Sequence, residues 1–240
     1  MCFTVAIHAT REEIESRFQA KFAAGEEFTP GYYFSAFTMP LLPVITGQEE
    51  SRIDMFRWGL VPFWVKDSTA ADSIRTKTFN AKAETLNEKP SFRNAVRSKR
   101  CLVISRGFFE WQSRQSEKIP HFIRLKTDEP FAFAGLYDNW LDRETGEIHN
   151  TFSIITTEAS PILAEIHNTK KRMPVILPRS VERDWIDPDR QTEKALELLV
   201  PVEDADLEAY TVSKLVSKQG VEKNVPEVIK PFDYNSSKLF

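Results

Sequence analysis

Cysteine is scarce in this 240-residue chain, which contains only Cys2 and Cys101. Two distant cysteines and four scattered histidines provide neither a disulfide framework nor the ligand spacing of a zinc site. The motifs G-x-S-x-G, G-x-G-x-x-G and H-E-x-x-H are absent, and so is the P-loop. These absences exclude the commonest hydrolases, nucleotide-dependent enzymes and metalloenzymes, and we expect no metal and no cofactor.

Long apolar runs are also missing. No stretch approaches the roughly 18 apolar residues of a membrane span. Residues 1–10 lack the basic start, apolar segment and small-residue cleavage site of a signal peptide. Together with the few cysteines, this pattern favours the reducing cytoplasm. We expect a monomer with no membrane partner. The sequence does not indicate which protein partners the chain has.

Charge is unevenly distributed along the chain, although the net charge is only −3. From Arg75 to Arg100 there are eight basic and two acidic residues, and from Glu182 to Glu208 ten acidic and three basic ones. The local field, not the net charge, attracts a phosphate backbone. The basic stretch is therefore consistent with a nucleic-acid groove, and an ordinary solvated surface is the alternative.

Strand patterns dominate the middle of the chain, without regular alternation of strand and helix. This predicts an α+β fold: a single domain, residues 1–232, with a central, partly barrel-like antiparallel sheet flanked by short helices. Residues 233–240 are expected to form a flexible tail. Strands are predicted over 32–45 (irregular), 52–60, 100–104, 108–112, 121–125, 131–141, 151–156, 172–177 and 208–212. Helices are predicted over 10–22, 91–98, 161–167, 180–186 and 191–199. Residues 61–72 are predicted to be a loop, and 79–88 a loop that runs into a helix.

Cys2 is the first candidate for chemistry. Methionine is usually removed before a small residue, so Cys2 would carry both a free α-amine and a thiol. An α-amine has a pKa of roughly 7.7–8.0, which leaves a neutral fraction able to attack an aldehyde. The thiol can then add to the imine carbon and close a five-membered thiazolidine. The plain alternative is an inert thiol near the end of the chain.

Glu110 lies within the segment Gly107–Trp111, between bulky aromatic residues of a predicted strand. Alternation places Phe108 and Glu110 on one face and Phe109 and Trp111 on the other. If Glu110 points into an apolar pocket, desolvation raises its pKa and makes it a candidate proton donor and acceptor. If it lies at an edge, it is an ordinary surface carboxylate.

Two further polar residues follow recognisable segments. Asn80, in Phe79–Thr85, offers a donor and an acceptor for a substrate or backbone group, or else caps a helix. His167, in Glu165–Leu177, precedes several cations that disfavour its protonated form, so it can act as a neutral base. A hydrogen-bonded structural histidine is the alternative.

Aromatic residues gather in Arg57–Asp67. Phe63 and Trp64, flanked by Lys66, suit stacking on the bases of a single strand, at about 1–3 kcal/mol per base. The alternative is that these rings fill a core. Lys82 and Arg93 lie close in sequence to Asn80 and are candidate phosphate contacts.

In this order, the motifs resemble the SOS response-associated peptidase (SRAP) family, whose members protect abasic sites by covalent cross-linking. The resemblance rests on Cys2 and on the following runs, and extends from Cys2 to about Pro231. The runs are W-G-L-V-P-F-W (58–64), F-N-A-K-A-E-T (79–85), G-F-F-E-W (107–111) and I-H-N-T-K-K-R-M-P-V-I-L (166–177).

The resemblance implies that this chain binds single-stranded DNA containing abasic sites and has abasic-site lyase activity. When bound to DNA, the cytoplasmic chain is then expected at the nucleoid. It implies that Cys2 forms the cross-link, Asn80 orders the site, Glu110 transfers protons and His167 assists lyase chemistry and cross-link reversal. It further implies that Phe63 and Trp64 wedge into the DNA and that Lys82, Arg93 and Arg172 contact phosphates.

The chain departs from the family pattern at three places. Many members begin Met-Cys-Gly-Arg, whereas Phe3 and Thr4 stand here, which removes one expected phosphate contact. Lys82 replaces an arginine that could bind bidentately. The segment from His167 to Arg172 is longer than in the shortest members.

Two other functions remain open on the sequence. Cys2 and His167 could serve an N-terminal-nucleophile cysteine peptidase or hydrolase, which could also remove Met1 autocatalytically. Alternatively, the chain could be a single-stranded-DNA binding module without catalysis.

Overall fold

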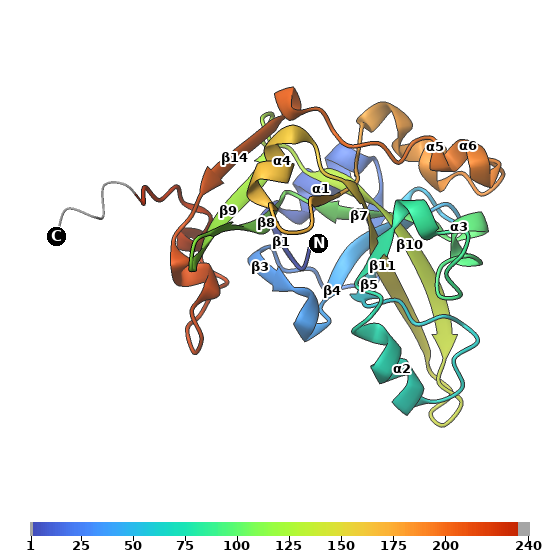
Figure 1. Ribbon diagram of the computed structural model, residues 1–240. Coiled ribbons are helices and arrows are strands. Elements are labelled where there is room, and N and C mark those ends of the chain that lie inside the picture. Colours follow the sequence, from blue (N-terminus) through green and yellow to red (C-terminus); the bar gives the residue numbers. More distant parts are fainter. Residues whose placement is uncertain (1, 235–240) are drawn as a thin grey trace.

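The computed structural model describes residues 2–234 and shows two β-sheets with short helices around them (Figure 1). The strands are β1 (Thr4–Ile7), β2 (Lys21–Phe22), β3 (Gly31–Ser35), β4 (Leu41–Thr46), β5 (Arg52–Trp58), β6 (Asn80–Lys82), β7 (Arg100–Ser105), β8 (Gly107–Arg114), β9 (Glu117–Leu125), β10 (Phe131–Leu141), β11 (Ile148–Glu158), β12 (Arg172–Pro174), β13 (Ile176–Leu177) and β14 (Leu207–Thr211). The α-helices are α1 (Arg11–Phe18), α2 (Ser68–Arg75), α3 (Ala95–Ser98), α4 (Pro161–Ile166), α5 (Glu182–Ile186) and α6 (Thr192–Leu196).

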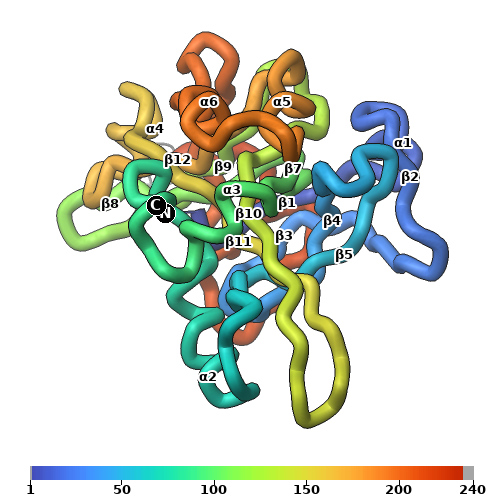
Figure 2. Tube along the Cα trace, turned by 90° about the vertical axis from the view of Figure 1, so that its right-hand side faces the viewer, coloured from blue at the N-terminus to red at the C-terminus, as the bar shows by residue number. Residues whose placement is uncertain are grey.

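The larger sheet closes into a barrel. Its strands follow the order β11–β10–β7–β4–β5, and β5 pairs in parallel with β11 to complete the ring. Trp58 at the end of β5 lies opposite Phe152 of β11, and the two rings stack with centroids 5.9 Å apart. Closure leaves no free edge in this ring of strands. Beyond the barrel, β10 and β11 extend as a long hairpin beside α2 (Figure 2).

The smaller sheet is antiparallel and has the order β14–β9–β8–β1–β3. One apolar core joins the two sheets: Phe108 of β8 packs edge-on against Phe133 of β10, with centroids 5.8 Å apart. The opposite face of β8 carries Phe109, which packs on Phe122 under the C-terminal segment. The two faces of β8 thus belong to different clusters, as the alternation predicted.

The predicted α+β class and partly barrel-like sheet are confirmed, with differences in detail. The sheet is not purely antiparallel, because β2–β5, β5–β11 and β6–β11 are parallel pairs. Helix α1 has the predicted capping box of Thr10 and Glu13. It ends at Phe18 instead of residue 22, because Gln19 adopts a left-handed conformation and the next segment pairs as β2.

Several other segments differ from the prediction. The helix expected over 91–98 spans only Ala95–Ser98, and strands β1 and β2 were not predicted. Residues 79–88 do not run from a loop into an α-helix: Asn80–Lys82 forms β6, and Ala83–Thr85 a single 3₁₀ turn. The predicted loop 61–72 is interrupted at Ser68 by α2, whose N-cap Asp67 accepts a hydrogen bond from the backbone N–H of Ala70. Most of the predicted tail, residues 235–240, lies outside the described residues. Among residues 2–234, no helix is long and apolar enough to cross a membrane.

Candidate active site

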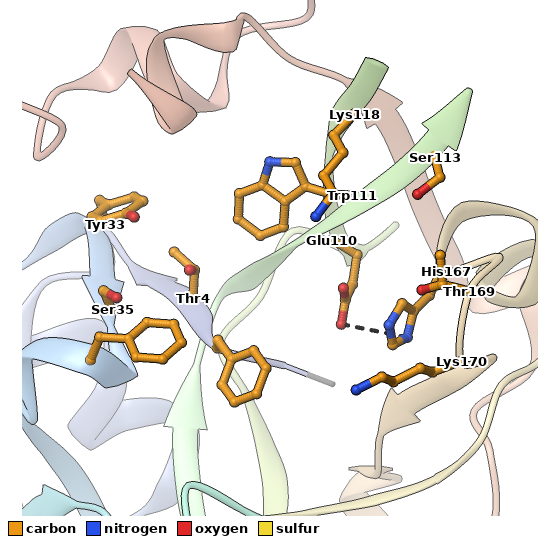
Figure 3. A pocket seen from close by; sticks show the side chains of 12 residues that line it. Thr4, Tyr33, Ser35, Glu110, Trp111, Ser113, Lys118, His167, Thr169 and Lys170 are labelled. Atoms are coloured by element: carbon orange, nitrogen blue, oxygen red, sulfur yellow. Dashed lines mark ion pairs between the residues drawn. The ribbon is translucent and has the colours of Figure 1, made fainter. Parts of the chain in front are cut away.

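A cavity of about 390 Å³ opens beside the start of β1. Strands β3, β8 and β9, the 3₁₀ turn after β3 and the loop after α4 form its walls (Figure 3). It is lined by Phe3, Thr4, Tyr33, Ser35, Phe37, Glu110, Trp111, Ser113, Lys118, His167, Thr169 and Lys170. Glu110 and His167, both predicted from the sequence, meet here, next to the residues that directly follow Cys2.

Cys2 directly precedes two residues of the cavity lining, Phe3 and Thr4, and its side chain is fully buried. Burial raises the pKa of its thiol well above the ordinary value, and the negative charge of Glu110 adds to this. The carbonyl oxygen of Cys2 accepts a hydrogen bond of 2.8 Å from Nδ2 of Asn80. Strand β6, paired with β11, places Asn80 there. Asn80 Oδ1 is buried and has no hydrogen-bond partner among residues 2–234, so it is available as an acceptor beside Cys2.

Glu110 is 4% exposed and points to the same side of β8 as Phe108, so the edge-exposed alternative is wrong. Burial raises the pKa of its carboxyl from 4.5 to about 7. The cause is desolvation, which disfavours the charged carboxylate. Near neutral pH this carboxyl therefore exchanges its proton readily, as a general acid and base requires.

His167 is the C-cap of α4 and faces Glu110, with 4.0 Å between Nδ1 and Oε1. The loop is fastened to β8 by its neighbour Asn168, which accepts from the backbone N–H of Ser113 at 3.1 Å and donates to its carbonyl at 2.8 Å. Nδ1 of His167 lies 2.7 Å from the carbonyl oxygen of Arg172 and 3.3 Å from its backbone nitrogen. The shorter contact favours a proton on Nδ1 and a lone pair on Nε2. Burial lowers the pKa of His167, which keeps the ring neutral at pH 7.

Arg172 is occupied by structural contacts. Its guanidinium binds the Glu84 carboxylate bidentately at 2.6 and 2.9 Å, and Nη2 donates to the carbonyl of Thr156 at 2.6 Å. It thereby ties β12 to β11 and to the turn after β6. A contact of Arg172 with a phosphate stays a prediction, and the ion pair with Glu84 would compete with it.

The aromatic loop is outside the cavity lining. Phe63 and Trp64 are 54% and 44% exposed, so they do not fill a core. The backbone N–H of Phe63 donates to Asp138 Oδ2 at 2.9 Å, and Asp138 is also paired with Lys99 at 2.5 Å. The loop is therefore held by its backbone while its two rings face solvent.

The basic stretch is only partly a surface feature. Lys82 and Arg93 are exposed. Arg100, in contrast, is 1% exposed and donates to backbone carbonyls, including those of Trp185 and Val96. The count of eight basic residues thus overstates the charge available to a polyanion.

Several cavity residues were not identified from the sequence. Phe37 is 69% exposed and lies 5.3 Å from the Phe3 ring, which adds an aromatic wall beside Cys2. Lys118 reaches the cavity because β9 pairs with β8. The hairpin turn at Gln115 contains no Gly, Asn or Asp, so its sequence signal was weak. Lys170 comes from the segment after His167. Among residues 2–234, no group of three or more His, Cys, Asp or Glu side chains could hold a metal.

The chain is similar to known proteins both in sequence and in structure. The family model described as "SOS response associated peptidase (SRAP)" matches residues 1–219. The chain is 37% identical over 233 residues to "Abasic site processing protein YoqW" of Bacillus subtilis (strain 168), covering 96% of this chain and 99% of that protein. It is 32% identical over 207 residues to "Abasic site processing protein HMCES" of Gallus gallus, covering 77% and 59%. A crystal structure of a Bacteroides thetaiotaomicron protein superposes with a TM-score of 0.90 at 37% identity, over 96% of this chain and 100% of that one.

Proposed function

This chain belongs to the SOS response-associated peptidase family, and we propose that it captures abasic sites in single-stranded DNA by a covalent bond to Cys2. The observation that carries the proposal is the pairing of buried Glu110, whose carboxyl pKa is about 7, with neutral His167 in a cavity next to Cys2. Relatives with 37% and 32% identity are named abasic site processing proteins, which supports the same substrate.

The reacting group is the α-amine of Cys2, which exists only after Met1 has been removed. The amine attacks C1′ of the ring-opened sugar aldehyde. Glu110, as an acid, protonates the departing hydroxyl, so water leaves and an imine forms. The Cys2 thiol then adds to the imine carbon, and its proton moves to the nitrogen, which completes the thiazolidine. Asn80 holds the Cys2 carbonyl throughout, and its Oδ1, buried and without a partner among residues 2–234, supports a role as acceptor for the amine.

The imine also has a second fate. Removal of a C2′ proton expels the phosphate at C3′ and breaks the strand, which is abasic-site lyase activity. His167, with its lone pair on Nε2, and the ionised form of Glu110 are the bases at the cavity. The same two groups return protons when the thiazolidine reopens, so they also support reversal.

DNA binding is assigned to the exposed rings and cations. Phe63 and Trp64 stack on unpaired bases, and Lys82 and Arg93 contact phosphates, so binding is largely independent of sequence. The alternative is a peptidase with the Cys2 thiol as nucleophile and His167 as base, and the experiment below separates the two functions.

One experiment tests the proposal. The purified chain, with Met1 removal verified by intact mass, is incubated with a single-stranded oligonucleotide carrying one abasic site and run on a denaturing gel. We expect a heat-stable shifted band with the unmodified chain and with Cys101→Ala, and none with Cys2→Ala. Peptide cleavage without a shifted band would favour the peptidase, and a band only on native gels would favour a non-catalytic binding module.

A further inference from the structure

The cavity contains a second primary amine. Lys170 lines it together with Glu110 and His167, and its ammonium makes no hydrogen bond or ion pair with residues 2–234. Figure 3 shows its Nζ pointing into the space beneath the Glu110–His167 pair. Burial is the main cause of the lowered pKa of His167, and the positive charge of Lys170 adds to it, so the two groups interact.

Lys118 provides an internal comparison. It also lines the cavity, from β9, but Figure 3 places its ammonium beside Trp111, on the side of the strand away from His167. Its charge is not among the causes that shift the pKa of Glu110 or His167. The two lysines line the same cavity and each carries one positive charge, but of the two only Lys170 is electrostatically coupled to a candidate base.

We propose that Lys170 is a second Schiff-base-forming amine for the same abasic aldehyde, and that it gives the protein a route to strand cleavage that does not use Cys2. This inference rests on the proposed function, because it requires the abasic sugar to enter this cavity.

The steps balance without a co-reactant other than water. The ammonium of Lys170 gives a proton to Glu110 or His167, and Nζ attacks C1′ of the aldehyde. Loss of water leaves an imine. A base takes the C2′ proton, the electron pair forms a C2′–C3′ double bond, and the C3′–O bond breaks with release of the 5′-phosphorylated strand. Water then hydrolyses the conjugated imine, which restores the Lys170 amine and leaves an unsaturated aldehyde on the other strand.

The two amines lead to different products because of their neighbours. An imine on Cys2 has a thiol sulfur three bonds from its nitrogen, through Cα and Cβ, and closes into a five-membered ring. An imine on Lys170 has no such thiol and either hydrolyses or eliminates. Cys2 therefore protects the lesion, whereas Lys170 cuts the strand. The Lys170 route remains available to a chain that keeps Met1, in which the Cys2 nitrogen is an amide.

The test is reductive trapping with sodium borohydride, which converts an imine into a stable secondary amine. The unmodified chain, Lys170→Arg and Lys118→Arg are incubated with the abasic oligonucleotide and reduced, and the modified peptide is located by mass spectrometry. Arginine keeps the positive charge but does not act as an amine nucleophile. We expect adducts on the N-terminal peptide and, as a minor product, on Lys170. The minor product should disappear in Lys170→Arg and persist in Lys118→Arg.

The outcomes separate the two proposals. Adducts only on the N-terminal peptide would overturn the role of Lys170 and leave the proposed function intact. A minor adduct on Lys118 in place of Lys170 would overturn the assignment to Lys170. Absence of any adduct, with the denaturing-gel band also missing, would overturn the proposed function together with this inference. In Cys2→Ala, strand cleavage should fall at least about twofold on adding Lys170→Arg, and unchanged cleavage would contradict the second route.

Discussion

The cavity next to Cys2 contains a buried carboxyl group, whereas the Phe63–Trp64 loop exposes two aromatic rings to solvent. In the cavity, Glu110 is 4% exposed, and burial moves its pKa to about 7. In the loop, Phe63 and Trp64 are 54% and 44% exposed, although apolar rings are usually buried. The loop keeps this conformation because its backbone is fixed, with Val61 N–H donating to Thr151 Oγ1 and Trp140 Nε1 to the Val65 carbonyl, both at 2.8 Å.

Under the proposed function, the contrast assigns a different role to each of the two regions. Removing water from a carboxyl tunes its proton affinity, which matters for a chemical step. Leaving aromatic rings in water provides apolar area that a ligand can cover, which matters for affinity. Substitutions in the cavity should therefore change the rate at saturating DNA, and substitutions in the loop should change the DNA concentration needed to reach that rate.

Glu110→Gln should give the largest effect. The amide keeps the shape of the side chain but cannot transfer a proton, so cross-linking at saturating DNA should slow by about 10²–10⁴-fold. The unmodified chain should show a bend in its rate profile near pH 7, where the Glu110 carboxyl titrates. Single-turnover cross-linking from pH 5 to 9 measures both. A normal rate together with weakened DNA binding would reverse the comparison and place Glu110 among the binding residues.

The same substitution should stabilise the fold at high pH. The Glu110 carboxyl has an ordinary pKa of 4.5 and a folded-state pKa of about 7, so the folded chain holds a proton that the unfolded chain releases. Stability is therefore lost as the pH rises through this window, by on the order of 3 kcal/mol above pH 7. Denaturant unfolding of Glu110→Gln and the unmodified chain should agree near pH 4 and diverge by pH 8. Equal stabilities at pH 8 would contradict the raised pKa.

Trp64→Ala should weaken binding of single-stranded DNA by about 1–3 kcal/mol while leaving the rate at saturation unchanged. Titration with a fluorescent oligonucleotide measures the first effect, and the denaturing gel measures the second. Phe232→Ala is a matched control, since Phe232 is also a partly exposed aromatic residue, at 38%, but packs on Tyr234. If Trp64→Ala instead slowed the chemistry at saturation, the two regions would not be separable.

Lys82→Gln should produce the smallest change. Loss of one phosphate contact should reduce the slope of log affinity against log salt by about 1 and weaken binding modestly at low salt. Lys126→Gln serves as the control, because Lys126 is exposed and lines a different cavity. Identical salt slopes for the unmodified chain and Lys82→Gln would remove Lys82 from the DNA surface.

Local patterns predicted the parts of the site that depend on local geometry. The two-residue period of a strand is enough to put Phe108 and Glu110 on one face, and the capping box of Thr10 and Glu13 identifies the start of α1. The recognisable motifs also indicated Asn80 and His167 as neighbours of Cys2, although the contact between Asn80 and the Cys2 carbonyl spans 78 positions.

The other parts of the site depend on contacts between segments far apart in the sequence, which local patterns do not predict. Strand β6 has three residues and exists because it pairs with β11, more than 70 residues later, which no local signal encodes. In the sequence, nothing near Arg172 indicates that it is paired. In the structure its guanidinium binds Glu84, 88 positions away. The wall formed by Phe37 and Lys118 depends on which strands flank β1 and β8, so it became visible only in the folded chain.

Strand β1 begins at Thr4 in the interior of its sheet, between β3 and β8, and Cys2 just before it is fully buried. This placement has a practical consequence for anyone who labels or purifies the protein. A tag or fluorescent fusion partner placed before Cys2 would extend the chain from a fully buried residue. It would also turn the amine into an amide, and a single residue left by a protease would do the same. Such partners belong at the opposite terminus.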